Sequence, residues 1–214
     1  MRIEFWCDII CPFCGLTEQR LENALAAFEH RADVQVIHRS FQLHPELQRA
    51  GITQHDLIVA RGLDPAEIEK NILRPIEDAA RREGLTVYRA IDRTLGPTDH
   101  AHELLAFAST KGLHAQAWRR MFRAHFGEAR KFWTVDQCVE FAADLGLDAT
   151  ESRLVLEDRR FREQVEDDQR EARRLGATGT PFMLIDRRYP VPGARDTEEL
   201  LNLLRRAWRD HPLV

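Results

Sequence analysis

The feature that most constrains the fold is a pair of cysteines, Cys11-Pro12-Phe13-Cys14, placed between a predicted strand and a predicted helix. Residues 3–10 form a short apolar run, which is typical of a buried strand. Over residues 21–28 apolar side chains recur at offsets of three and four, which indicates an amphipathic helix. Pro12 fits the first turn of this helix, where its missing N–H costs little. The chain therefore begins with a strand that runs directly into a helix, with two thiols at the junction.

The rest of the chain has three parts. A second apolar strand is predicted over residues 34–41, which completes a βαβ start. From residue 45 to residue 175 the pattern is helical and is interrupted by glycines. Two short strands follow, over residues 182–185 and 189–191, and Asp196 is placed to cap a last helix. We therefore expect an α/β fold, in which residues 1–44 and 176–214 form a βαβ/ββα domain and residues 45–175 form an inserted helical domain.

Composition excludes several classes of protein. The 214 residues carry 31 basic and 35 acidic side chains, so no basic excess indicates nucleic-acid binding. No apolar run approaches the roughly 18 residues of a membrane-spanning helix. The first residues include Glu4 and lack the apolar core of a signal peptide. We expect a cytoplasmic protein, and in a reducing compartment its four cysteines favour catalytic or metal-binding roles. The sequence does not indicate the oligomeric state.

The spacing of Cys11 and Cys14 suits thiol–disulfide exchange. At the start of a helix, unpaired backbone N–H groups and the helix dipole favour a thiolate on Cys11. Cys14 lies three residues on, nearly one turn away on the same face, and can resolve a mixed disulfide formed at Cys11. The alternative is a zinc site that adds Cys7 and a histidine such as His38 or His44. Because no second C-x-x-C is present, we expect no metal.

A second feature is Gly179-Thr180-Pro181, directly before the strand of residues 182–185. A proline is tolerated at the first position of a strand, so an ordinary turn is one interpretation. The other is a Thr–cis-Pro loop that lies against Cys11 and pairs with an extended substrate segment.

These motifs resemble the FrnE-type branch of the DsbA family of dithiol oxidoreductases. Besides Cys11-Pro12-Phe13-Cys14, the resemblance rests on three further blocks of sequence: Arg39-Ser40-Phe41-Gln42-Leu43-His44-Pro45, Thr98-Asp99-His100-Ala101-His102 and Gly176-Ala177-Thr178-Gly179-Thr180-Pro181-Phe182. The resemblance implies a thioredoxin-like βαβ/ββα domain with a large all-helical insertion. It also implies catalytic cysteines at Cys11 and Cys14. Expected substrate contacts are Pro12, Phe13, Thr180, Pro181 and His102.

The resemblance leaves three points open. Thioredoxin and DsbA have a buried acid six residues before the first cysteine, whereas this chain has Phe5 there. Glu4 and Asp8 are nearby but not at that position, so no proton acceptor is predicted.

Two other functions remain as alternatives. One is glutathione-type chemistry, as in kappa-class transferases and 2-hydroxychromene-2-carboxylate isomerase, and the other is non-enzymatic binding or chaperone-like activity. We expect a protein or small-molecule thiol or disulfide substrate, and no cofactor besides a low-molecular-weight thiol as co-substrate.

Overall fold

The computed structural model describes residues 1–210, and its central element is a four-stranded sheet in the order β2-β1-β5-β6. Strand β1 (Arg2–Cys7) pairs in parallel with β2 (Gln35–Ser40) and antiparallel with β5 (Phe182–Ile185). Strand β6 (Tyr189–Pro192) closes the sheet as the partner of β5. Segments from both ends of the chain thus meet at β1, the strand that leads to the cysteine pair.

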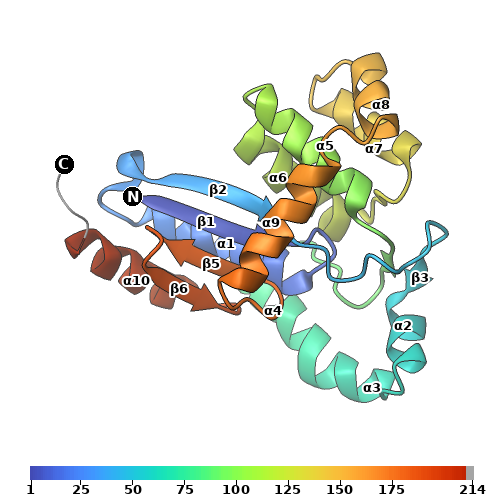
Figure 1. Cartoon of the computed structure of the whole chain (residues 1–214). Coiled ribbons are helices and arrows are strands. Elements are labelled where there is room, and N and C mark those ends of the chain that lie inside the picture. The colour runs from blue at the N-terminus through green and yellow to red at the C-terminus, as the bar shows by residue number, and fades with distance from the viewer. Residues whose placement is uncertain (211–214) are drawn as a thin grey trace.

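Helices cover both faces of this sheet, and β1 is therefore buried on both sides. Helix α1 (Pro12–Ala26) packs against α10 (Thr197–Arg209) on one face, and α9 (Arg162–Arg174) crosses the other (Figure 1). Side chains of β1 alternate between two apolar clusters: Ile3 and Phe5 join the larger cluster, and Trp6 joins the one beneath α9. This alternation is the period of two of a strand.

The middle of the chain is mostly helical and lies at the β1–α1 end of the sheet (Figure 1). It begins with the short strand β3 (Ile52–Thr53), which pairs with β4 (Thr94–Leu95). Its helices are α2 (Gln54–Ala60), α3 (Pro65–Ile68), α4 (Arg74–Arg82), α5 (Asp99–Thr110), α6 (His114–Phe122), α7 (Val135–Asp144) and α8 (Ala149–Glu157). Two π-helical segments, Glu69–Leu73 and Arg123–Gly127, extend α3 and α6, and a 3-10 turn at Arg31–Asp33 precedes β2.

The predicted fold class is confirmed: a thioredoxin-like βαβ/ββα unit carries a helical insertion. Capping boxes form at Thr134 and at Asp196. The strand pair β3–β4 is an addition to the predicted all-helical insertion. The division at residues 44 and 176 stays a prediction, and α9, which falls within the predicted insertion, packs against β1 and β2.

Candidate active site

The cysteine pair lies where β1 gives way to α1. Cys11 is the N-cap residue, with an extended backbone conformation, and Pro12 occupies the first helical turn. The Cys11 backbone N–H donates to the Asp8 carbonyl (3.1 Å), and the Cys11 carbonyl accepts from Cys14 N–H (3.0 Å). Both cysteines are buried free thiols. The local sequence therefore fixes the two thiols at the start of α1, where the helix dipole favours an anion.

The Thr180–Pro181 loop faces these thiols. The Thr180–Pro181 peptide bond is cis, and Cys11 Sγ lies 3.6 Å from the Thr180 carbonyl oxygen. The Pro181 carbonyl accepts from Gly193 N–H (2.9 Å), which ties the loop to the end of β6. Phe13, between the cysteines, has a side chain that is 38% exposed. Pro12, Phe13, Thr180 and Pro181, all predicted to contact substrate, are thus grouped around Cys11.

The two thiols differ in their affinity for a proton. Burial by itself raises the pKa of Cys11, but interactions with the side chains of Cys14 and Thr180 and with the Cys14 backbone lower this pKa below its usual value. Burial and the adjacent Cys11 raise the pKa of Cys14 well above its usual value. Because the thiolate is the attacking species, this asymmetry favours Cys11 as the nucleophile.

His102, the remaining predicted substrate contact, lies in a different position. Its side chain on α5 is fully buried, so it does not reach a substrate from this position. Its Nε2 instead lies 3.3 Å from Oδ1 of Asp8, which is also fully buried. Asp8 is a neighbour of Cys11 that the sequence did not single out as functional. The signal available was its place three residues before Cys11.

Two further buried residues contact the backbone beside Cys11, and neither was predicted. The Arg93 guanidinium, between α4 and β4, donates to the Ile10 carbonyl. Burial lowers the pKa of Arg93 to about 10. The Tyr88 hydroxyl donates to the Pro12 carbonyl, and its ring stacks on Phe126 with centroids 4.6 Å apart. Both residues lie in an irregular segment with no periodic pattern, so no sequence signal indicates that they contact the site.

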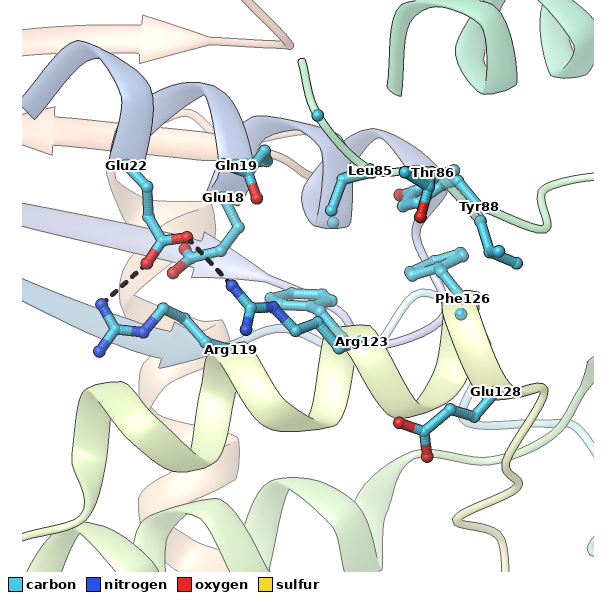
Figure 2. A pocket seen from close by; sticks show the side chains of 15 residues that line it. Glu18, Gln19, Glu22, Leu85, Thr86, Tyr88, Arg119, Arg123, Phe126 and Glu128 are labelled. Atoms are coloured by element: carbon cyan, nitrogen blue, oxygen red, sulfur yellow. Dashed lines mark hydrogen bonds and ion pairs between the residues drawn. The ribbon is translucent and has the colours of Figure 1, made fainter. Parts of the chain in front are cut away.

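A cavity of about 350 Å³ lies beside α1. Figure 2 shows Glu22 facing Arg119 and Arg123 at one end, and Tyr88 and Phe126 at the other. The Arg119 guanidinium lies 2.9 Å from the Glu22 carboxylate, and Arg123 lies 3.9 Å from it. Tyr88 lines this cavity and also donates a hydrogen bond to the Pro12 carbonyl, between the two cysteines. The cavity is therefore separated from the dithiol backbone by one side chain.

The two cysteines outside the pair are deeply buried. Burial raises the pKa of Cys7 well above its usual value, and burial also raises that of Cys138. Within residues 1–210, no group of three or more His, Cys, Asp or Glu side chains is arranged to hold a metal ion. Over the same residues, no helix has the length and apolar character needed to cross a bilayer.

A Cys-x-x-Cys pair at a helix start, beside a Thr–Pro loop on a β2-β1-β5-β6 sheet, is the arrangement of thioredoxin-fold dithiol proteins. Residues 2–205 match the family model of the DSBA-like thioredoxin domain. The chain therefore belongs to the DsbA-like family of thioredoxin-fold disulfide oxidoreductases, and it is an enzyme of thiol–disulfide exchange. The resemblance to the DsbA family is confirmed, and its FrnE-type branch stays a prediction.

Solved structures agree with this assignment, whereas no curated protein matches the chain. A probable DsbA oxidoreductase from Streptomyces coelicolor is 38% identical, with a TM-score of 0.92 over 100% of this chain and 92% of that one. A 2-hydroxychromene-2-carboxylate isomerase is 15% identical (TM-score 0.71; 98% and 95% covered). The cytosolic disulfide reductase DsbM from Pseudomonas aeruginosa, solved with GSH, is 20% identical (TM-score 0.63; 98% and 100% covered). The last two share the fold.

Proposed function

We propose that Cys11 and Cys14 are the redox centre of this oxidoreductase, with Cys11 as nucleophile and Cys14 as resolving thiol. The observation that carries this proposal is the position of the pair at the start of α1, where Cys11 is the N-cap residue and its Sγ lies 3.6 Å from the Thr180 carbonyl oxygen. The lowered pKa of Cys11 and the raised pKa of Cys14 agree with these two roles. Phe13, exposed between them, and the Thr180–Pro181 loop are proposed to contact the substrate.

The cycle follows from these positions. The Cys11 thiolate attacks a substrate disulfide, an S–S bond forms between Cys11 and the substrate, and the other substrate sulfur leaves as a thiolate. Cys14 then loses its proton and attacks Cys11 Sγ. The Cys11–Cys14 disulfide forms as the mixed disulfide breaks, and the substrate departs with both sulfurs reduced. Two electrons have passed from the enzyme dithiol to the substrate; the reverse sequence oxidises a substrate dithiol.

We also propose a cytoplasmic location and a low-molecular-weight thiol that restores the reduced enzyme. The fold shared with DsbM, a cytosolic reductase solved with GSH, supports both parts of the proposal. The three sequence blocks described above support the FrnE-type branch.

Reduction of insulin by a dithiol reductant tests the redox centre. The wild-type enzyme should accelerate the reaction, and Cys11→Ser should abolish the acceleration. Cys14→Ser should accumulate a mixed disulfide on Cys11, detectable by mass spectrometry. Cys138→Ser is the matched control, because this thiol is buried in α7 with its Sγ 3.4 Å from the Phe132 carbonyl. An inactive wild type would refute the proposal and favour a binding protein, and an active Cys11→Ser would refute the assignment of Cys11 as the nucleophile.

A further inference from the structure

Asp8 is held by three groups at the mouth of the dithiol. Its backbone carbonyl accepts from Cys11 N–H (3.1 Å) and so shapes the turn that presents Cys11. Its Oδ2 accepts from Leu43 N–H (2.6 Å), and its Oδ1 lies 3.3 Å from His102 Nε2. Because the Asp8 and His102 side chains are both fully buried, solvent screens neither of them.

A carboxylate in this place opposes ionisation of the nearby thiols. The Asp8 charge contributes to raising the pKa of Cys11 and that of Cys7. The interactions of Cys11 with Cys14 and Thr180 outweigh this contribution. Asp8 therefore limits how far the helix start stabilises the Cys11 thiolate, and a less stable thiolate makes the disulfide a weaker oxidant.

Other titratable groups face this part of the site. Cys7 comes from β1 and Cys14 from α1. Tyr88 and Arg93 come from the segment between α4 and β4 and interact electrostatically with Cys11. The Asp8 charge also interacts electrostatically with His125, in the π-helical segment after α6, and with His44, which follows β2. Among these groups Arg93 is the buried cation, so it counters Asp8 at Cys11.

Among the residues described, the hydrogen bonds to the Asp8 carboxylate come from Leu43 N–H and from His102, and His102 is the one that lies on a helix of the insertion. Its other ring nitrogen, Nδ1, is buried and has no hydrogen-bond partner in residues 1–210. The ring also lies 5.6 Å from that of Trp118 on α6. The imidazole is thus enclosed, and Asp8 is the polar group that its side chain engages.

We propose that Asp8 and His102 are positioning residues of the dithiol: the Asp8 backbone carbonyl holds the Cys11 turn, the buried Asp8 carboxylate opposes negative charge on Cys11, and His102 holds that carboxylate in place. The inference rests on the proposed role of Cys11. Thioredoxin and DsbA have a buried acid at the position of Phe5. This chain has instead the buried pair Asp8 and His102, whose two members are 94 residues apart in the sequence.

The test is the pKa of Cys11 in Asp8→Asn, measured from the pH dependence of alkylation by iodoacetamide, with mass spectrometry to assign the site. The amide keeps an acceptor for Leu43 N–H and removes the charge. The Cys11 pKa should fall by about one unit, a tenfold rise in the thiolate-to-thiol ratio. At a pH above both pKa values, the same factor makes the reduction potential of the dithiol less negative by about 30 mV.

Two further variants separate this role from a structural one. Asp168→Asn is the matched control: Asp168 is also buried and paired, with Arg39 (3.0 Å), but it lies on the α9 side of the sheet. It should leave the Cys11 pKa unchanged. His102→Leu removes the group that holds Oδ1 of the Asp8 carboxylate, so the released carboxylate opposes the Cys11 thiolate less. This variant should lower the Cys11 pKa as Asp8→Asn does, and His102→Gln, which retains a donor, should restore the wild-type value.

The double variant Asp8→Asn/His102→Leu should match Asp8→Asn alone, because His102 acts through the Asp8 charge. An unchanged or raised Cys11 pKa in Asp8→Asn would overturn the inference, and so would an equal fall in Asp168→Asn. Alkylation needs only the reduced protein. Failure of the inference is therefore distinguishable from failure of the proposed function, which would appear as a wild-type enzyme inactive toward insulin.

Discussion

Replacement of Gly15 by alanine tests how closely the insertion is fitted to the dithiol. Gly15 follows Cys14 on α1, and a Cβ there would lie 2.6 Å from Tyr88 Oη and 2.9 Å from the Phe126 ring. These distances are shorter than any ordinary van der Waals contact. Tyr88 must therefore move, and its hydrogen bond to the Pro12 carbonyl is lost.

The expected cost follows from three opposing contributions. Alanine favours a helix over glycine by about 1 kcal/mol. Overpacking of a filled site costs about 1–3 kcal/mol, and loss of the Tyr88–Pro12 hydrogen bond costs about 1 kcal/mol more. The two losses exceed the gain, so Gly15→Ala should lower the free energy of unfolding by roughly 1–3 kcal/mol. Loss of the Tyr88 hydrogen bond also leaves the backbone between the two cysteines less firmly held, so insulin reduction by Gly15→Ala should be slower.

Urea unfolding of the reduced protein measures this effect, and Tyr88→Phe isolates its cause. Without the hydroxyl the nearest clash is removed, so Gly15→Ala should cost about 1 kcal/mol less in the Tyr88→Phe background. Gly127→Ala is the matched control: it also lines the cavity in a helical segment, but its Cβ would meet only the Val87 carbonyl, at 3.7 Å. If Gly15→Ala is as stable as the wild type, the reasoning is refuted.

Two further predictions concern buried charges. Although burial raises the pKa of Glu18, the charge and hydrogen bond of His38 (2.7 Å) lower it overall. This contribution to stability is therefore present above the unfolded-state pKa of about 4.3 and is lost as the pH falls through the folded-state value. Glu18→Gln should lower the free energy of unfolding by about 1–3 kcal/mol at neutral pH, and the difference should shrink in acid urea titrations. Arg93→Met should remove the hydrogen bond to Ile10 and a buried cation, which raises the Cys11 pKa in the alkylation assay; an unchanged pKa would contradict this.

The parts of the site that follow from local sequence were predicted, and those set by tertiary contacts were not. The start of α1 at Pro12 and the loop at Thr180–Pro181 depend on residues adjacent in the chain. The partner of Asp8 is 94 residues away. His102 was expected as a substrate contact from the family resemblance, whereas the structure places it against Asp8. The reason is that α5 is buried on every side from His100 to Ala108. A helix without a polar face gives no periodic signal of where one side chain points.

The insertion contributes directly to the dithiol. Tyr88, Arg93 and His102 all belong to the predicted insertion, and each contacts a residue within three positions of Cys11, namely Pro12, Ile10 or Asp8. Two of these contacts fix backbone carbonyls and the third holds a buried carboxylate, so together they determine both the geometry and the charge around the nucleophile. Loss of packing between the insertion and β1–α1 would therefore change the chemistry of Cys11 even with the Cys-x-x-Cys turn intact. The same sequence motif can then have different reactivity in relatives whose insertions differ, which is why the motif alone does not determine the direction of exchange.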